Sequence, residues 1–252
     1  LRIKSVLMAP TGRAAKVLTG YTGKSAFTIH KKIYRQQSVA DGLGVFVLDK
    51  NLHNNTWFIV DESSMISNQA GENMVFGTGR LLDDLLEYVY SGEGCRLVLA
   101  GDTAQLPPVG ISVSPALDNR VLEENGFEVI DNELTDVVRQ ERESGILFNA
   151  TRMREKIFSS EGIQGFFRIV LPDGGEPEKI SGADLMEKLS SSYGKYGIHE
   201  TVVLTRSNKR ANLYNQGIRS SILYRDTEIA RGDLLMVVRN NYFWLKEDAG
   251  ID

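Results

Sequence analysis

Short apolar runs rich in strand-forming residues alternate along this chain with longer segments of helical periodicity. The predicted strands span residues 5–9, 57–60, 96–100, 128–130, 201–204 and 234–238. The predicted helices span residues 13–18, 29–34, 80–90, 115–124, 145–157, 183–193 and 208–222. Strands that are apolar at almost every position, with helices between them, are typical of a parallel sheet covered by helices on both faces. The pattern therefore predicts an α/β fold.

Polar residues stand directly after four of the predicted strands. These residues lie in the segments Pro10-Thr11-Gly12-Arg13 after the first strand, Asp61-Glu62 after the second, Gly101-Asp102 after the third, and Thr205-Arg206-Ser207-Asn208 after the strand at 201–204. Open α/β sheets bind their ligands beyond the carboxyl ends of the strands. We therefore expect one ligand cleft, or a pair of facing clefts, at this edge.

Asp61 and Glu62 place two adjacent carboxylates at the end of an apolar strand. Magnesium bound to a nucleotide takes one or two carboxylates, several waters and the phosphate oxygens, so this pair suits such an ion. The second carboxylate can orient and deprotonate an attacking water. Asp-Glu after a strand is also typical of a helix N-terminus, where a carboxylate caps the helix and interacts with its dipole. The pair alone leaves both interpretations open.

The next strand along the chain leads into a second polar segment, which reads LVLAGDTAQLPPVG over residues 97–110. Gln105 can donate a hydrogen bond to a phosphate oxygen or position a water, while Pro107 and Pro108 stiffen the loop. Pro-Pro-Val-Gly is also an ordinary turn sequence. The combination of this segment with Asp61 and Glu62 on an adjacent strand is much rarer than either feature alone, and the combination favours a nucleotide site.

Composition narrows the class of protein. The chain has 252 residues, of which 42% are hydrophobic and 25% charged, which fits one large domain or two smaller ones with a substantial core. No apolar run reaches the roughly 18 residues of a membrane span, so we expect no membrane association. Cys95 is the only cysteine, which excludes an internal disulfide and fits a reducing cytosol. Its apolar neighbours indicate a buried structural thiol.

The charge is distributed unevenly. The net charge of −4 does not suggest a nucleic-acid partner, but no acidic residue precedes Asp41, and lysines, arginines and His30 fill that segment. One basic face on an acidic protein is compatible with a polyanionic partner. A solvated basic face without a partner is an equally good interpretation of the charge alone.

Six motifs occur in the order found in superfamily 1 helicases: APTGRAAKVL, TIHKKIY, IVDESSMI, LAGDTAQLPPVG, LTDVVRQ and VLTRSNKRANLYNQGIR. They look most like superfamily 1B, the RecD/Dda-type branch of 5′-to-3′ translocases on single-stranded DNA, which includes the α-subunit of exodeoxyribonuclease V. The segment GDLLMVVRNNY, residues 232–242, also resembles RecD-like proteins. The resemblance implies a RecA-like P-loop NTPase fold. The first lobe would span 1–150, and a partial second lobe would span 151–252 and end at the start of an inserted small β domain.

The resemblance implies ATP and Mg²⁺ as cofactors and gives roles to four residues. Asp61 would hold the Mg²⁺, and Glu62 would be the base that activates the attacking water. Gln105 would sense the γ-phosphate and couple it to DNA. Arg139, in VVRQ, looks like the arginine that stabilises transition-state charge, a contribution of about 10³ to 10⁵ in rate. Without the neighbouring motifs, Arg139 would be interpreted as a surface arginine beside a helix.

Seven residues match family segments that touch DNA. They are Pro10, Thr11 and Arg13 of APTGRAA, Thr28 and His30 of TIHKKIY, and Arg206 and Asn208 of TRSN. His30 could instead be a partly buried helix histidine, but its place in the acid-free segment favours DNA contact. Capping of a helix by Ser207 explains part of the TRSN motif equally well.

An ATPase of this type also needs a P-loop, GxxxxGK[ST], between a strand and a helix. The sequence GYTGKS at 20–25 resembles its end, but Leu18 stands where the first glycine belongs. We interpret GYTGKS as the end of a helix and expect the P-loop to precede Leu1. The last two family motifs would follow Asp252, and the insert at about 35–55, where relatives carry a strand-separating pin, is short. The chain alone is therefore expected to be inactive.

The sequence-based hypothesis is a cytoplasmic, ATP-dependent 5′-to-3′ DNA helicase or translocase whose partner is single-stranded DNA, with nuclease or repair subunits as further partners. The alternative is a non-catalytic DNA-binding scaffold subunit of a nuclease or repair complex. The joint presence of Asp61, Glu62, Gln105 and Arg139 argues against the scaffold, which needs none of them. An independent exonuclease lacks support, because no further cluster of acidic residues, lysine or histidine of nuclease type is visible.

Overall fold

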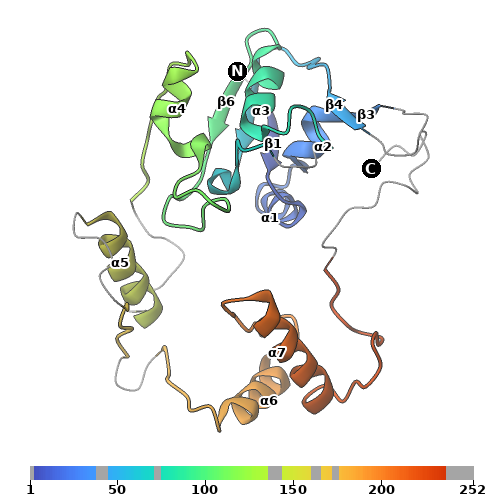
Figure 1. The fold of residues 1–252 in the computed structure, drawn as a ribbon, viewed down its shortest axis with the longest axis vertical. Coiled ribbons are helices and arrows are strands. Elements are labelled where there is room, and N and C mark those ends of the chain that lie inside the picture. The colour runs from blue at the N-terminus through green and yellow to red at the C-terminus, as the bar shows by residue number, and fades with distance from the viewer. Residues whose placement is uncertain are drawn as a thin grey trace. The chain divides into compact units, whose positions relative to one another are not determined.

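The computed structural model describes residues 3–37, 45–70, 75–135, 144–159, 166–171 and 176–236 (Figure 1). These residues form two compact units, the first within 3–135 and the second within 144–236. That these two units are the two predicted lobes, 1–150 and 151–252, stays a prediction. Among the described helices, none is long and apolar enough to cross a membrane.

The first unit is built on a four-stranded parallel sheet in the order β2-β1-β5-β6. Its strands are β1 (Lys4–Ala9), β2 (Ala26–Thr28), β5 (Thr56–Val60) and β6 (Arg96–Leu99). The α/β fold with a parallel sheet is therefore confirmed. Because all four strands run in the same direction, their carboxyl ends lie at one edge of the sheet.

The register of the strands assigns alternate residues to one buried face. Met8 pairs with Val60, which pairs with Leu99, and Val6 pairs with Phe58, so these side chains share a face. Met8, Phe58 and Val60 are fully buried there. Each such side chain contributes about 1.5–3 kcal/mol by leaving water.

Helices cover this face of the sheet. The cluster continues into α2 (Ile29–Ile33) and α3 (Leu81–Tyr90), while α1 (Gly12–Thr22) connects β1 to β2 and contacts both strands. On the opposite face Trp57 is still 38% exposed, so the described helices cover that face only in part.

A β-hairpin stands between α2 and β5, in the short insert. Strands β3 (Tyr34–Gln37) and β4 (Val45–Leu48) pair antiparallel, from Tyr34 opposite Leu48 to Gln37 opposite Val45. The sequence pattern did not predict it, because three of the four residues of β3 are polar and exposed and carry no alternation. Packing of the other residues compensates, since Tyr34 is buried and Phe46 stacks on Phe76 with ring centroids 4.5 Å apart.

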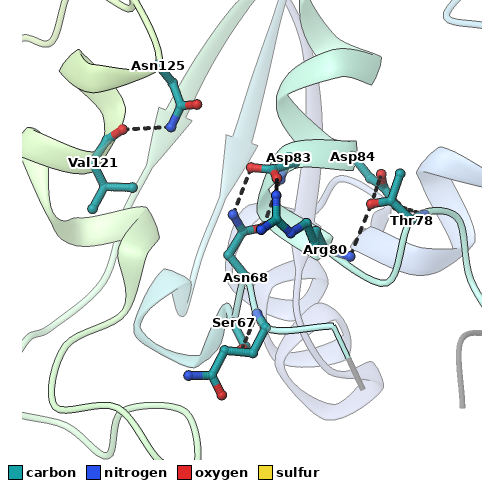
Figure 2. Close-up of polar contacts among 9 residues, drawn as sticks. Ser67, Asn68, Thr78, Arg80, Asp83, Asp84, Val121 and Asn125 are labelled. Atoms are coloured by element: carbon teal, nitrogen blue, oxygen red, sulfur yellow. Dashed lines mark hydrogen bonds and ion pairs between the residues drawn. The ribbon is translucent and has the colours of Figure 1, made fainter. Parts of the chain in front are cut away.

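Buried polar contacts fix α3 to its surroundings. The carboxylate of Asp84, which is 1% exposed, accepts hydrogen bonds from the Tyr34 hydroxyl (2.6 Å), the Thr78 hydroxyl (2.7 Å) and the Thr78 backbone N–H (3.0 Å). Figure 2 shows Asp84 beside Thr78, and Asp83 between Asn68 and Arg80. The Asn68 side chain accepts from the Asp83 backbone N–H and donates to its carboxylate, so it caps α3 from outside the helix.

Some predicted elements differ from the structure. The predicted helix at 115–124 is divided at Asp118 into a 3₁₀ turn, η2 (Pro115–Leu117), and α4 (Asn119–Glu124). Residues 128–130, predicted as a strand, form a loop. Asp118 explains the division, because its side chain accepts from the Arg120 backbone N–H and starts a new helix.

The second unit has helices α5 (Gly145–Phe158), α6 (Leu185–Tyr196) and α7 (Asn208–Ser221) and no strand within its described residues. The predicted strand at 201–204 is therefore wrong, and so is the described part, 234–236, of the strand predicted at 234–238. Val202 and Leu204 are 79% and 90% exposed. A strand needs a neighbour to satisfy its backbone groups, and these residues have none among those described.

We expect the substitution Tyr34→Phe to lower the free energy of unfolding by roughly 0.5–1.5 kcal/mol, the net worth of a hydrogen bond, because the Asp84 carboxylate loses one of its donors. Urea unfolding followed by circular dichroism measures the change. Tyr21→Phe is the matched control, since Tyr21 is exposed on α1. Equal stability of the two variants would show that the buried contact contributes nothing.

Candidate active site at the carboxyl edge of the sheet

Asp61 and Glu62 lie at the carboxyl end of β5, as the sequence predicted. The Asp61 backbone N–H donates to the Met8 carbonyl (3.0 Å), which extends the pairing of β5 with β1 by one residue. One oxygen of the Asp61 carboxylate accepts from the Glu62 backbone N–H (2.9 Å). Both side chains are half-buried, and neither forms an ion pair with another described residue. Their carboxylates are therefore available to a cation.

Glu62 adopts an unusual backbone conformation, with φ 56° and ψ 37° in the left-handed region. For a residue other than glycine this conformation costs on the order of 1–3 kcal/mol and persists only where the surroundings impose it. Glu62 caps the short 3₁₀ turn η1 (Ser63–Met65) through its backbone, without a side-chain hydrogen bond. The carboxylate that is predicted to act as the base is thus carried on a strained turn.

The end of β6 supports this turn. The Ser63 backbone N–H donates to the Ala100 carbonyl (2.8 Å), and the Ser63 hydroxyl donates to the Val60 carbonyl (3.1 Å). Gly101 lies so close that an added Cβ would stand 2.9 Å from the Ser64 nitrogen and 2.8 Å from Leu117 Cδ1. Glycine is therefore required here by close approach of two backbones.

The loop that carries Gln105 starts from the same place. The Asp102 side chain accepts from the Ala104 backbone N–H (2.9 Å), and the Gln105 backbone N–H donates to the Asp102 carbonyl (3.0 Å). The Gln105 side chain is exposed, as are Leu106 (87%) and Val109 (97%) further along. Because β6 is the neighbour of β5, Gln105 and the two carboxylates belong to one edge of the sheet.

The residues present suit a nucleotide-bound magnesium. Asp61 and Glu62 supply the one or two carboxylates that Mg²⁺ takes from protein, with waters and phosphates as its remaining ligands. Within the described ranges no group of three or more His, Cys, Asp or Glu side chains could form a fully protein-bound metal site. The arrangement thus fits an ion that shares its ligands with a nucleotide.

The GYTGKS segment is the end of a helix, which confirms the sequence interpretation. Helix α1 continues to Thr22, and Gly23 follows at φ 67° with its backbone N–H bonded to the Thr19 carbonyl (2.9 Å). This is an ordinary glycine C-cap. Lys24 is exposed beyond it. The segment lacks the strand–loop–helix context that a phosphate cradle needs.

The two threonines predicted to touch DNA both cap helices. Thr11 accepts from the Ala14 backbone N–H (3.2 Å) at the start of α1, and Thr28 accepts from the Lys31 backbone N–H (3.1 Å) at the start of α2. Ala9 pairs with Thr28, so the structure brings these two segments to neighbouring strand ends. Pro10 is half-buried and Arg13 is exposed on the first turn of α1.

His30 lies in an aromatic cluster. Its ring centroid is 4.9 Å from that of Phe76 and 5.7 Å from that of Tyr34. Burial lowers the pKa of His30, so the ring is held neutral at a pH where an exposed histidine begins to charge. Contact of His30 with DNA stays a prediction.

The remaining predicted residues belong to the second unit or lie outside the described residues. Arg206 and Asn208 stand at the start of α7, where the Ser207 hydroxyl accepts from the Arg210 backbone N–H (3.3 Å). A cavity of about 400 Å³ there is lined by Arg206, Ser207 and Arg210. Arg139 lies outside the described residues, and its predicted role stays a prediction.

Comparison with protein-family models gives a match that covers this edge of the sheet. The family model of an AAA domain matches residues 3–159, which include Asp61, Glu62 and Gln105. The chain belongs to the AAA domain family. This is a family of P-loop NTPases that bind nucleotide with Mg²⁺ and is often found in superfamily 1 helicases. A search of curated proteins finds no match.

Gly101 and Ser114 contact the turn that carries Glu62, but neither is among the catalytic or binding residues predicted from sequence. The Ser114 hydroxyl lies 2.8 Å from the Ser63 carbonyl oxygen and 2.7 Å from that of Ile66. The only sequence signal for it is the Ser-Pro pair that starts η2, which indicates a cap and not a contact with a residue 51 positions away. Gly101 carries no signal beyond its place after a strand.

We expect Gly101→Ala to lower the free energy of unfolding by about 1–3 kcal/mol, the usual cost of overpacking, because the new methyl group would collide with the backbone of η1. Thermal unfolding measures the effect. Gly20→Ala is the control, since an added Cβ at Gly20 meets no atom within 4 Å. A Gly101→Ala variant as stable as Gly20→Ala would contradict the close packing.

Proposed function

We propose that the protein carrying this chain is an ATP-driven 5′-to-3′ motor on single-stranded DNA, a RecD-like helicase or translocase. One observation carries the proposal. Asp61 and Glu62 end the strand that is paired with β6, whose loop presents Gln105, inside a domain of a P-loop NTPase family. A cytoplasmic location and nuclease or repair subunits as partners belong to the same proposal.

The two carboxylates have different roles in hydrolysis. Asp61 is the magnesium ligand, because its carboxylate is held at the strand end by the Glu62 backbone N–H and leaves its other oxygen open. Magnesium, when bound, neutralises charge on the phosphates. Glu62 accepts a proton from the attacking water at a carboxylate oxygen. The Gln105 amide, on an exposed loop, is free to turn toward a phosphate oxygen.

The DNA-binding surface would be the neighbouring part of the same edge. Pro10, Thr11 and Arg13 follow β1, while Thr28 ends β2 and His30 follows it, and the two strands pair with each other. Arg13 is the exposed cation of this set. Coupling between ATP hydrolysis and DNA movement requires that the two sites be mechanically connected. A nucleotide site and a DNA site on adjoining strand ends of one sheet meet this requirement. The order of the six motifs supports the RecD-like type and its polarity.

In the full-length protein, Glu62→Gln is expected to lower DNA-stimulated ATP hydrolysis by about 10²- to 10⁴-fold, because the amide cannot take up the proton. ATP binding should persist, since Asp61 is untouched. Steady-state hydrolysis with and without single-stranded DNA, together with titration of a fluorescent ATP analogue, measures both. Glu123→Gln, on the exposed face of α4, makes the same charge change away from the site.

Two outcomes would decide against the motor. Normal turnover by Glu62→Gln would remove the assigned base. Absence of any hydrolysis by the full-length wild-type protein, with DNA bound, would instead favour the non-catalytic scaffold subunit.

We also expect Arg13→Ala to weaken binding of this chain to a fluorescent oligo(dT). Loss of one phosphate contact should reduce the slope of log K against log salt by about 0.7. Anisotropy titrations at several salt concentrations measure the slope. Lys4→Ala is the control, because Lys4 begins β1 at the opposite edge of the sheet. Equal losses for both variants would indicate general charge attraction and no DNA site at the carboxyl edge.

A further inference from the structure

Ser114 spans the turn that carries Glu62. Its side chain is buried, with the residue only 2% exposed, and its oxygen lies 2.8 Å from the Ser63 carbonyl oxygen and 2.7 Å from the Ile66 carbonyl oxygen. A serine hydroxyl has one proton, so the two carbonyls share it. The hydroxyl oxygen also accepts from the Ala116 backbone N–H (3.2 Å), which fixes its direction. One side chain thus joins the first residue of η1 to the residue after its last.

The segment that carries Gln105 both leaves from η1 and returns to it. It leaves at Ala100, whose carbonyl accepts from the Ser63 N–H (2.8 Å), and at Gly101, which packs on the Ser64 nitrogen. It returns at Ser114. A displacement of the exposed loop between these two anchors therefore acts on the turn through them.

We propose that Ser114 is a positioning residue that keeps Glu62 in its left-handed conformation and couples Glu62 to the Gln105 loop. The inference rests on the proposed function, because Glu62 is taken to be the base. Ser114 acts only through the backbone of η1: its hydroxyl holds the two carbonyls that follow Glu62. Without it, the Ile66 carbonyl loses its bond to η2, and the turn is held by its own two bonds, Met65 N–H to the Glu62 carbonyl and Ile66 N–H to the Ser63 carbonyl (both 3.1 Å), and by the contacts of Ser63 with Ala100 and Val60.

Ser64 provides a matched control in the same turn. Its hydroxyl is also buried, with the residue 3% exposed, but forms no hydrogen bond to any described residue. Ser114→Ala and Ser64→Ala therefore remove the same atom from neighbouring buried positions, with two carbonyl partners in one case and none in the other.

The first test needs no activity. Hydrogen–deuterium exchange of the chain should show faster exchange in Ser114→Ala at the peptide covering 61–66, with β1 and β5 unchanged, because local opening of η1 becomes easier. Ser64→Ala should exchange like the wild type. Unchanged exchange at 61–66 in Ser114→Ala, or equal acceleration in both variants, would overturn the positioning role.

The second test uses the full-length protein. Ser114→Ala should lower kcat for DNA-stimulated hydrolysis by about 10- to 100-fold, as loss of a supporting group around a site does, with KM for ATP unchanged. In a Glu62→Gln background the same substitution should cause no further loss, because Ser114 acts through Glu62. A further loss there would show a general structural role. Full kcat in Ser114→Ala, with hydrolysis lost in Glu62→Gln, would overturn this inference alone, whereas full activity of Glu62→Gln would overturn the proposed function.

Discussion

The pairing of β5 with both β1 and β6 is the constraint on which the site depends. The pairing continues beyond the strands, through Asp61 N–H to Met8 and Ala100 N–H to Val60 (2.8 Å), so three chain segments leave the sheet at the same level. Parallel strands end at one edge by geometry, and this is why open α/β sheets place ligands there. The carboxylates, the Gln105 loop and the Thr11–Arg13 segment are neighbours because the strand register brings the ends of β1, β5 and β6 to one edge of the sheet.

The strain at Glu62 follows from the same constraint. After β5 the chain passes the end of β6, where Ser63 bonds to Ala100, and the left-handed residue Glu62 provides the turn of the backbone between them. On one side, the Ser63 backbone N–H donates to Ala100, the Ser63 carbonyl accepts from Ser114, and Gly101 packs against the turn. On the other side Ile66 is fully buried and Asn68 is fixed to Asp83 at the start of α3 (Figure 2). An acidic residue takes this conformation at the strand end because the surroundings over-determine it.

The parts of the fold that could be predicted are those that a short window of sequence determines. The strands of the first unit are apolar at nearly every position, and the polar residues after them identify the functional edge. The hairpin was missed because β3 reads Tyr-Arg-Gln-Gln, with one buried residue, and the contacts that hold the hairpin are distant in sequence: Phe46 stacks on Phe76, and Tyr34 donates to the Asp84 carboxylate 50 residues away. The run at 201–204 was mistaken for a strand for the converse reason: apolar residues favour a strand, but only a neighbouring strand makes one.

The residues of the candidate site also fall into those that a short window of sequence identifies and those that distant contacts determine. The place of Asp61, Glu62 and Gln105 at the carboxyl edge could be predicted because polar residues follow apolar strands there, whereas the contacts of Gly101 and Ser114 with η1 depend on the folded chain. Ser64 shows the difference most plainly. It stands in the same turn as Ser63, is equally buried, and has no partner for its hydroxyl among the described residues. The left-handed conformation of Glu62, held by contacts from β6 and η2, indicates that the turn is set by its surroundings and not by the local preference of its own residues.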